Sequence, residues 1–252
     1  MSLYAQDEAF QEIRQKTIQL YTKAKFTEAL RSANELITLK PSDAFSYKLR
    51  AAIYVDLDKF AEARKDFSQA GELDPDDAFT HFNIGETYFL DKYYSNAIKH
   101  FRNFMKKEPN NELALFKIFL CNILSEQQQE VDQALSTLQP SPVSPLYYFA
   151  HAAIAFNKEN PDKANELIST ANNIYPNDQI LTFVDSFLEL GWVKTDQNVA
   201  KPIISGDKLK SMSSQSFHAE PIEAPVLTKL EDLLPLDEEE DEDKEKQEDN
   251  NQ

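Results

Sequence analysis

Apolar residues recur along this chain at intervals of three and four positions, which is the spacing of one face of an α-helix. The pattern predicts five consecutive pairs of helices and one further helix. The expected ranges are 10–23, 26–39, 44–57, 60–73, 78–91, 94–107, 112–125, 130–138, 145–158, 161–174 and 178–190. The chain holds only four Gly in 252 residues, too few for the tight turns of a β-sandwich or barrel. The fold class expected from the sequence is therefore all-α.

The helix pairs follow a repeat of 34 residues. Pro41, Pro75 and Pro109 are spaced at this interval, and Asp43, Asp77 and Asn111 follow them by two positions. Pro ends a helix and Asp or Asn caps the next one, so the combination marks the boundary between units. The same frame repeats a small residue at Ala29, Ala63 and Ala97 and an aromatic residue at Phe26, Phe60 and Tyr94. A small residue lets two helices cross closely, and the aromatic residue fills the wedge between neighbouring pairs.

This arrangement resembles the tetratricopeptide repeat family, whose units are helix pairs of 34 residues. Two units carry most of the family's pattern, with Tyr47, Ala51, Tyr54, Phe60, Ala63, Phe67, Ala70 and Pro75 in one and Gly85, Tyr88, Tyr94, Ala97, Phe101 and Pro109 in the next. The resemblance covers roughly residues 10–176 and implies a superhelix of about five helix pairs with a capping helix after it. The repeat is irregular at 112–140, where Ala134 lies 37 residues after Ala97. We expect a longer turn at 125–130 and, because Phe119 replaces the small residue, a splayed helix pair.

The composition divides the chain into two regions, a superhelix with its capping helix at 8–193 and a tail at 194–252. Residues 197–252 contain fifteen Asp or Glu against six Lys or Arg, a balance typical of disorder. The segment 221–236 is an apolar island in this tail, with Leu spaced for one face of a short helix. We expect it either to dock intramolecularly in the superhelix or to be a Leu-containing linker.

Charge and residue content exclude several classes of function. The net charge of −17 opposes binding to nucleic acid and to anionic membranes. The single Cys121 excludes an intramolecular disulfide, and the four His lack the spacing of a metal site. No stretch of eighteen apolar residues and no signal-peptide pattern is present, so we expect a cytoplasmic protein. Without a Gly-rich phosphate loop or a catalytic cluster, we expect no enzyme, no cofactor and no metal.

The resemblance implies a protein-binding surface, because in this family the first helix of each pair lines a concave groove that binds extended peptides. The groove residues are chiefly those at positions two, five, nine and twelve of each unit. The partner-binding residues expected here are Phe45, Lys48, Phe79, Phe82, Glu86, Phe89, Leu113, Phe116, Lys117 and Leu120. So many Phe would form an exposed apolar patch, and such patches usually mark binding sites. The alternative is that these side chains pack on adjacent helices.

Two known types of groove help to define the expected partner. The carboxylate clamp that holds the acidic C-terminus of a heat-shock chaperone needs several convergent basic and amide donors. Lys48, Asn83 and Lys117 match this clamp, whereas Ala52 and Leu113 do not. The groove is loosely similar to that of tetratricopeptide chaperones of type III secretion. We expect a non-enzymatic adapter or chaperone that holds an extended apolar segment of a partner protein, or alternatively an assembly scaffold that uses its convex face or caps.

Overall fold

The structure, a computed structural model, describes residues 3–194 of the chain, with side chains from Asp7 onward. This part of the chain forms eleven α-helices and no β-strand. The helices are α1 (Leu3–Thr22), α2 (Phe26–Leu39), α3 (Ala44–Asp56), α4 (Phe60–Leu73), α5 (Phe79–Leu90), α6 (Tyr94–Met105), α7 (Glu112–Leu124), α8 (Gln128–Thr137), α9 (Leu146–Asn157), α10 (Pro161–Ile174) and α11 (Asn177–Glu189). The all-α prediction is confirmed. The predicted division at residue 194 and the island at 221–236 lie at or beyond the end of the described residues.

The predicted boundaries between units are correct because the expected caps form. The Asp43 carboxylate accepts a hydrogen bond from the backbone N–H of Ser46 at 2.8 Å, and the Asn111 side chain accepts one from Ala114 at 2.9 Å. Asp77 accepts one from the N–H of Phe79 at 3.0 Å. Each bond satisfies an N–H group that the first turn of a helix leaves without a partner.

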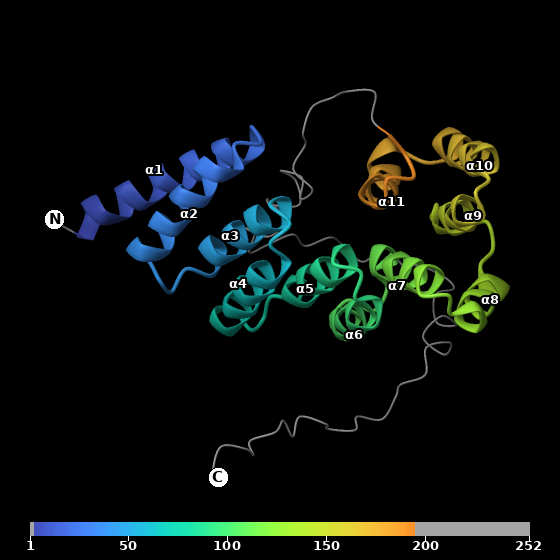
Figure 1. The fold of residues 1–252 in the computed structure, drawn as a ribbon, viewed down its shortest axis with the longest axis horizontal. Helices are drawn as coiled ribbons and strands as arrows, with labels where there is room; N and C mark the ends of the chain where they lie inside the picture. Colours follow the sequence, from blue (N-terminus) through green and yellow to red (C-terminus); the bar gives the residue numbers. More distant parts are fainter. Residues whose placement is uncertain (1–2, 195–252) are drawn as a thin grey trace, which may run out of the picture.

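The helix pairs stack into an arc (Figure 1). Within a pair the two helices pack closely, and the second helix of each of the first three pairs packs on the first helix of the next. The second helices α4, α6, α8 and α10 lie on the outer side of the arc, and α3, α5, α7 and α9 lie on its inner side (Figure 1). Gly85 shows why a small residue is needed at the crossing of α5 and α6, since a Cβ atom there would lie 2.9 Å from the Phe101 ring. The inner side is the concave surface on which the expected binding residues lie.

The turn inside each pair uses a left-handed backbone conformation that recurs with the repeat. The residues are Ala24, Asp58, Lys92, Glu126 and Glu159, with φ between 54° and 64°. Their spacing is 34 residues three times and then 33, so the fourth pair has a turn of the usual length. The longer turn predicted at 125–130 is therefore wrong. Val131, which is 4% exposed, occupies the position of the repeated Ala, and Ala134 does not.

The irregularity lies instead after this turn. Helix α8 has only ten residues, and it contacts α7 less than the second helix contacts the first in the other pairs. This confirms the predicted splay, for which the 5% exposed Phe119 supplies the bulk. Gln128 also stands where the earlier units have the wedge-filling aromatic residue. As a result α9, which pairs with α10, contacts α7 of the preceding pair and makes little contact with α8.

Helix α11 follows the last pair but turns inward. It contacts α7 as well as α10, although α7 belongs to the pair before last. In Figure 1 it lies inside the arc, next to α9. The helix does close the end of the stack, as a capping helix would, but its apolar face covers part of the concave surface.

Candidate protein-binding surface

The ten residues expected to bind a partner lie on α3, α5 and α7, but they do not form an exposed apolar patch. Phe79 is the most accessible of the Phe among them at 36% exposure, and Phe82, Phe89 and Phe116 are buried. Phe45, Lys48, Glu86, Lys117 and Leu120 are also buried, and Leu113 is half-buried. The expectation of an open row of Phe is therefore wrong. The alternative, that these side chains pack on adjacent helices, describes the surface.

Two of the Phe on α5 contact the second helix of their own pair. The Phe82 ring lies 5.3 Å from that of Phe101 and 5.1 Å from that of Phe104, both on α6. The Phe89 ring lies 6.0 Å from that of Tyr94. These contacts belong to the interior of one repeat unit, because the helical phase turns positions five and twelve toward α6. A charged residue at Phe82 would disrupt packing before it affected any groove.

Phe116 lies in an aromatic cluster that joins three helices. Its ring centroid is 5.1 Å from that of Phe183 and 5.7 Å from that of Phe187, both on α11. Phe149 of α9 contacts the same two rings at 5.0 and 5.7 Å. These four residues, which we call the aromatic cluster, are each at most 4% exposed. Helix α11 thus covers the concave surface of α7 and α9 with its own apolar face.

Lys117 links α11 to this surface by charge. Its Nζ atom lies 3.0 Å from Glu86 Oε1 on α5 and donates a hydrogen bond to Glu189 at the end of α11. The ammonium also lies 4.6 Å from the centre of the Phe89 ring. Burial by itself lowers the pKa of Lys117, but the charges of Glu189 and Glu86 outweigh it, so the pKa lies above its ordinary value. Lys117 is only 1% exposed, and it holds a carboxylate from α11 at the centre of the groove.

The N-terminal half of the concave surface is also occupied by internal contacts. The Arg14 guanidinium lies 3.9 Å from the centre of the Phe45 ring. Lys48 pairs with Asp77 at 2.6 Å and lies 3.8 Å from Asp74. Lys48 was expected to contact a bound peptide, but this pairing fixes α3 to the loop before α5. Whether any of the ten residues binds a partner remains a prediction.

The sequence did not indicate the residues that cover the groove. Phe183 and Phe187 are spaced for one helical face, which is a signal for a packed helix but not for the surface that it covers. The partnership of Lys117 with Glu189 spans 72 residues, and no spacing rule predicts it. The contact between α11 and α7 joins helices that are far apart in the sequence, and the pattern of the irregular segment does not predict it.

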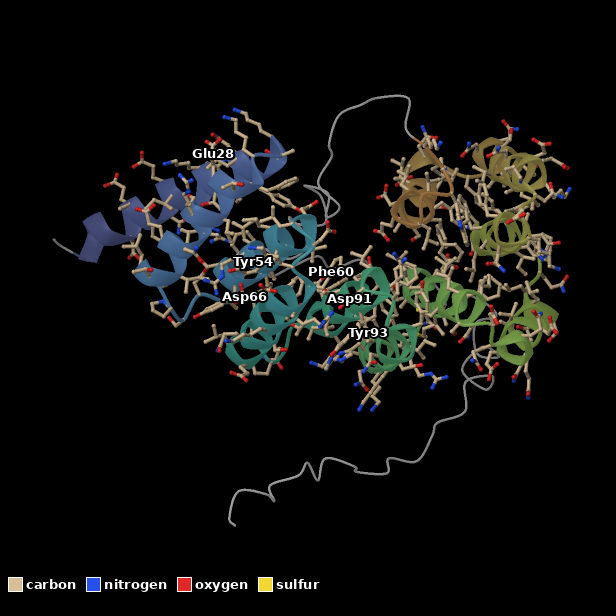
Figure 2. All side chains as sticks on the ribbon, in the orientation of Figure 1. Glu28, Tyr54, Phe60, Asp66, Asp91 and Tyr93 are labelled. Atoms are coloured by element: carbon tan, nitrogen blue, oxygen red, sulfur yellow. The ribbon has the colours of Figure 1, made fainter. Side chains whose placement is uncertain are left out.

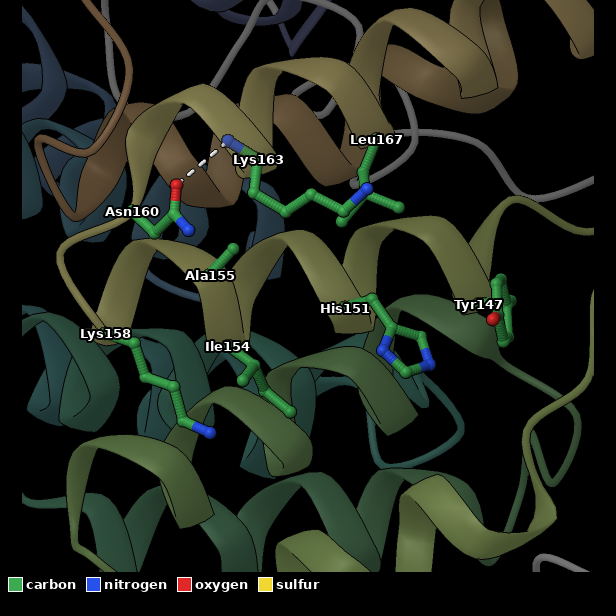
Figure 3. Close-up of a pocket in the computed structure, with 8 residues that line it drawn as sticks. All are labelled: Tyr147, His151, Ile154, Ala155, Lys158, Asn160, Lys163 and Leu167. Atoms are coloured by element: carbon green, nitrogen blue, oxygen red, sulfur yellow. Dashed lines mark hydrogen bonds between the residues drawn. The ribbon is translucent and has the colours of Figure 1, made fainter.

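A second depression lies on the other side of α9, between the second helices α8 and α10. One part has a volume of about 400 Å³ and is lined by residues that include Tyr147, His151, Lys158 and Leu167 (Figure 3). An adjoining part of about 290 Å³ shares His151 and Lys158 and reaches α8 at Val131. The weak contact between α8 and α9 leaves this space open.

Burial also shifts the pKa values of two further side chains, Cys121 and His100. Burial raises the pKa of the Cys121 thiol and lowers the pKa of His100 to about 4. Within residues 3–194, no three His, Cys, Asp or Glu side chains are grouped closely enough to hold a metal ion. No helix in this range is both long and apolar enough to cross a membrane.

Comparison with known proteins places the fold. A search of curated protein sequences gave no significant match. Among solved structures, MamA from Desulfovibrio magneticus RS-1 is 16% identical, with a TM-score of 0.51 over 66% of this chain and 94% of that one. PilF from Pseudomonas aeruginosa is 15% identical, with a TM-score of 0.49 over 75% and 88%. The TPR2B domain of yeast Sti1, in a complex with Hsp70, is 27% identical, with a TM-score of 0.41 over 47% and 97%.

A family model covers part of the repeat region. Residues 51–91 match the model of the TPR repeat, and this segment runs from the middle of α3 to the end of α5. The helix pairs on either side of it continue the same 34-residue turn positions. Residues 51–91 are therefore similar to the tetratricopeptide repeat family, and the flanking helix pairs keep the spacing of its repeat.

Proposed function

We propose that this chain is a non-enzymatic protein-interaction module, an adapter or chaperone that holds an apolar segment of a partner protein on its concave surface. One observation carries the proposal, namely the way in which α11 lies on α7 and α9. Helix α11 is an amphipathic segment whose two Phe fill the aromatic cluster and whose Glu189 pairs with Lys117. A partner segment with the same features would find the same contacts.

The partner segment is expected to combine two aromatic or large aliphatic anchors with one carboxylate. Phe183 and Phe187 are four residues apart on one helical face, so a helical segment matches the surface better than the extended peptide expected from the sequence. The carboxylate is needed because Lys117 is buried and an unpaired buried charge is costly. A purely apolar segment would therefore bind less well than one that ends in Glu or Asp.

Binding at this surface requires α11 to leave it. Because α11 is tethered, it competes at an effective concentration on the order of millimolar. Its contacts lie at the end of the stack, where a repeat protein opens at the lowest cost. The surface is thus expected to exchange its own helix for a partner segment, with the rest of the stack remaining folded.

A titration with the α11 segment itself tests this function. A peptide of residues 177–193 is added to the full chain carrying Phe187→Ala, which weakens the docking of the internal helix. Leu181→Ala is the matched control, since Leu181 lies on α11 but is 58% exposed. The Phe187→Ala chain should bind the peptide at least about tenfold more tightly than the Leu181→Ala chain. A peptide with Ser at positions 183 and 187 should not bind.

The outcome that contradicts the function is a folded Phe187→Ala chain that does not bind the peptide. Circular dichroism establishes folding, and Glu189→Gln offers a milder variant that loosens α11 without leaving a cavity. If neither variant binds the peptide, the concave surface serves packing alone.

A second function, as an assembly scaffold, is favoured by the depression between α8 and α10. It exposes part of α9 on the outer side of the arc, where partner chains can approach without displacing any helix. His151→Glu would then weaken a stable complex while leaving the peptide titration unchanged.

A further inference from the structure

Helix α6 carries the strongest local charge of opposite sign to the whole protein. The segment 92–107 contains five Lys or Arg and no Asp or Glu, in a chain of net charge −17. The net charge of the whole chain does not reveal this local basic segment. Four of the five basic residues, Lys92, Lys99, Lys106 and Lys107, are exposed and therefore available for contact.

Three of these five basic residues lie on the outward side of α6 and of the residues that flank it. Lys92, Lys99 and Lys106 are seven residues apart, so they lie on one face of the helix and its preceding turn. All three are exposed, and the positions between them on this face are Ser95, Asn96 and Asn103. Figure 2 shows blue nitrogen atoms at the ends of many of the side chains that project outward from α6. We call these six residues the basic stripe.

The three lysines of the stripe are not neutralised within the described part of the chain. None of them forms an ion pair there, whereas the nearby Arg64 pairs with Asp91 at 2.8 Å. The positive charges of the segment 92–107 also affect the pKa values of two nearby His residues. Burial is the main cause of the lowered pKa of His100 and of His81, and the charges of Lys99, Lys106 and Lys107 lower these values further.

We propose that the basic stripe of α6 docks the acidic segment Asp237–Asp249 of the same chain. That segment holds ten Asp or Glu and two Lys, so it is the densest negative charge in the sequence. The two segments carry opposite charges and attract each other. Because they belong to one chain, their contact does not cost the translational entropy of bringing two molecules together. An oligonucleotide or an anionic membrane is a less suitable occupant, because the rest of the protein repels both.

The tether is long enough for this contact. Residues 195–236 separate the end of the described chain from the acidic segment, and 42 residues reach at most about 140 Å. Five helix pairs stacked at about 10 Å each extend about 50 Å, so every outer face lies within range. The contact lies on the outer side of the arc and does not involve the concave surface, so it is independent of the function proposed above.

A spin label on the acidic segment tests the proposal in the full chain. Gln247→Cys places a reactive thiol there, and the native Cys121 is fully buried and does not compete for the label. The expected result is a loss of the backbone amide signals of α6 in the NMR spectrum. The signals should return when the salt is raised to about 1 M, where charges are screened beyond about 3 Å.

Matched variants separate the stripe from the general charge of the protein. Replacing Lys92, Lys99 and Lys106 by Gln should restore the α6 signals. Replacing Lys16, Lys23 and Lys158 by Gln changes the net charge equally at exposed sites on or next to other helices, and it should leave the loss in place. Signal loss centred on another helix overturns the proposal. The proposal is also overturned if the spin label leaves the α6 signals unchanged and these signals respond only to an added oligonucleotide or to anionic vesicles.

Discussion

Replacing Lys117 by Met removes the charge that pairs with both Glu86 and Glu189 in the concave surface. Met has a similar length and fills the same space, so the change tests charge rather than volume. At 3.0 Å from Glu86 Oε1, an attraction of about 5 kcal/mol is expected for an effective dielectric constant of 20. Desolvation offsets part of it, and breaking a buried ion pair of this kind typically costs about 3–5 kcal/mol. We expect Lys117→Met to lower the free energy of unfolding by that amount.

The pH dependence of this loss identifies its cause. Loss of the Lys117 charge should raise the pKa values of the Glu86 and Glu189 carboxylates, so the variant should recover stability as the pH falls and they become protonated. In the unsubstituted chain the raised pKa of Lys117 means that its contribution is fully present below pH 10.5 and is lost as the pH rises above it. Urea denaturation followed by circular dichroism at pH 5 and 7 measures the first trend, and the same measurement above pH 10.5 measures the second.

Two controls make the result specific. Adding Glu86→Gln and Glu189→Gln to Lys117→Met should regain most of the lost stability, since the buried charges are then gone. Lys163→Met removes an exposed pair with Glu166 and should cost less than about 1 kcal/mol. If Lys117→Met costs no more than Lys163→Met, the buried pair does not fix α11 to the groove.

Two further substitutions and one labelling experiment test the packing of the helix pairs. The pKa of His100 is lowered to about 4, so its contribution to stability is present above pH 6.5 and is lost as the pH falls; His100→Gln should flatten the decline of the melting midpoint between pH 6.5 and 4. Gly85→Ala places a Cβ 2.9 Å from the Phe101 ring and should cost about 1–3 kcal/mol in urea denaturation. The buried Cys121, whose pKa burial raises, should react with a thiol reagent only at the rate of unfolding, and fast reaction in native buffer would contradict its burial.

The helix boundaries could be predicted well from the sequence because the repeated Pro and the capping Asp or Asn mark them. Predicted ranges 26–39 and 60–73 agree with α2 and α4 at both ends. The wrong prediction of a longer turn in the fourth pair arises from aligning Ala134 with the repeated Ala. Val131 takes the repeated position in α8, because a slightly larger side chain fits there when α7 and α8 splay. The left-handed turn residues would have located this turn, but in this chain none of them is Gly.

The surface was harder to predict because periodicity shows which residues share a face but not what covers that face. Phe82 and Phe116 occupy the same position in their units, yet one contacts α6 and the other contacts α11. The difference arises where the arc tightens after α8, and this depends on contacts between segments far apart in sequence. Lys117 could be singled out as a groove residue, but its partner Glu189 could not.

The concave surface of α7 and α9 holds an apolar helical segment, α11, and the proposed function depends on this contact. The most direct measurement is the set of nuclear Overhauser contacts among the aromatic rings of the full chain in solution. We expect contacts from Phe183 and Phe187 to both Phe116 and Phe149, because the ring centroids lie 5.0 to 5.7 Å apart. Rings of α11 that contact only α10, with Phe116 accessible to solvent, would contradict this expectation.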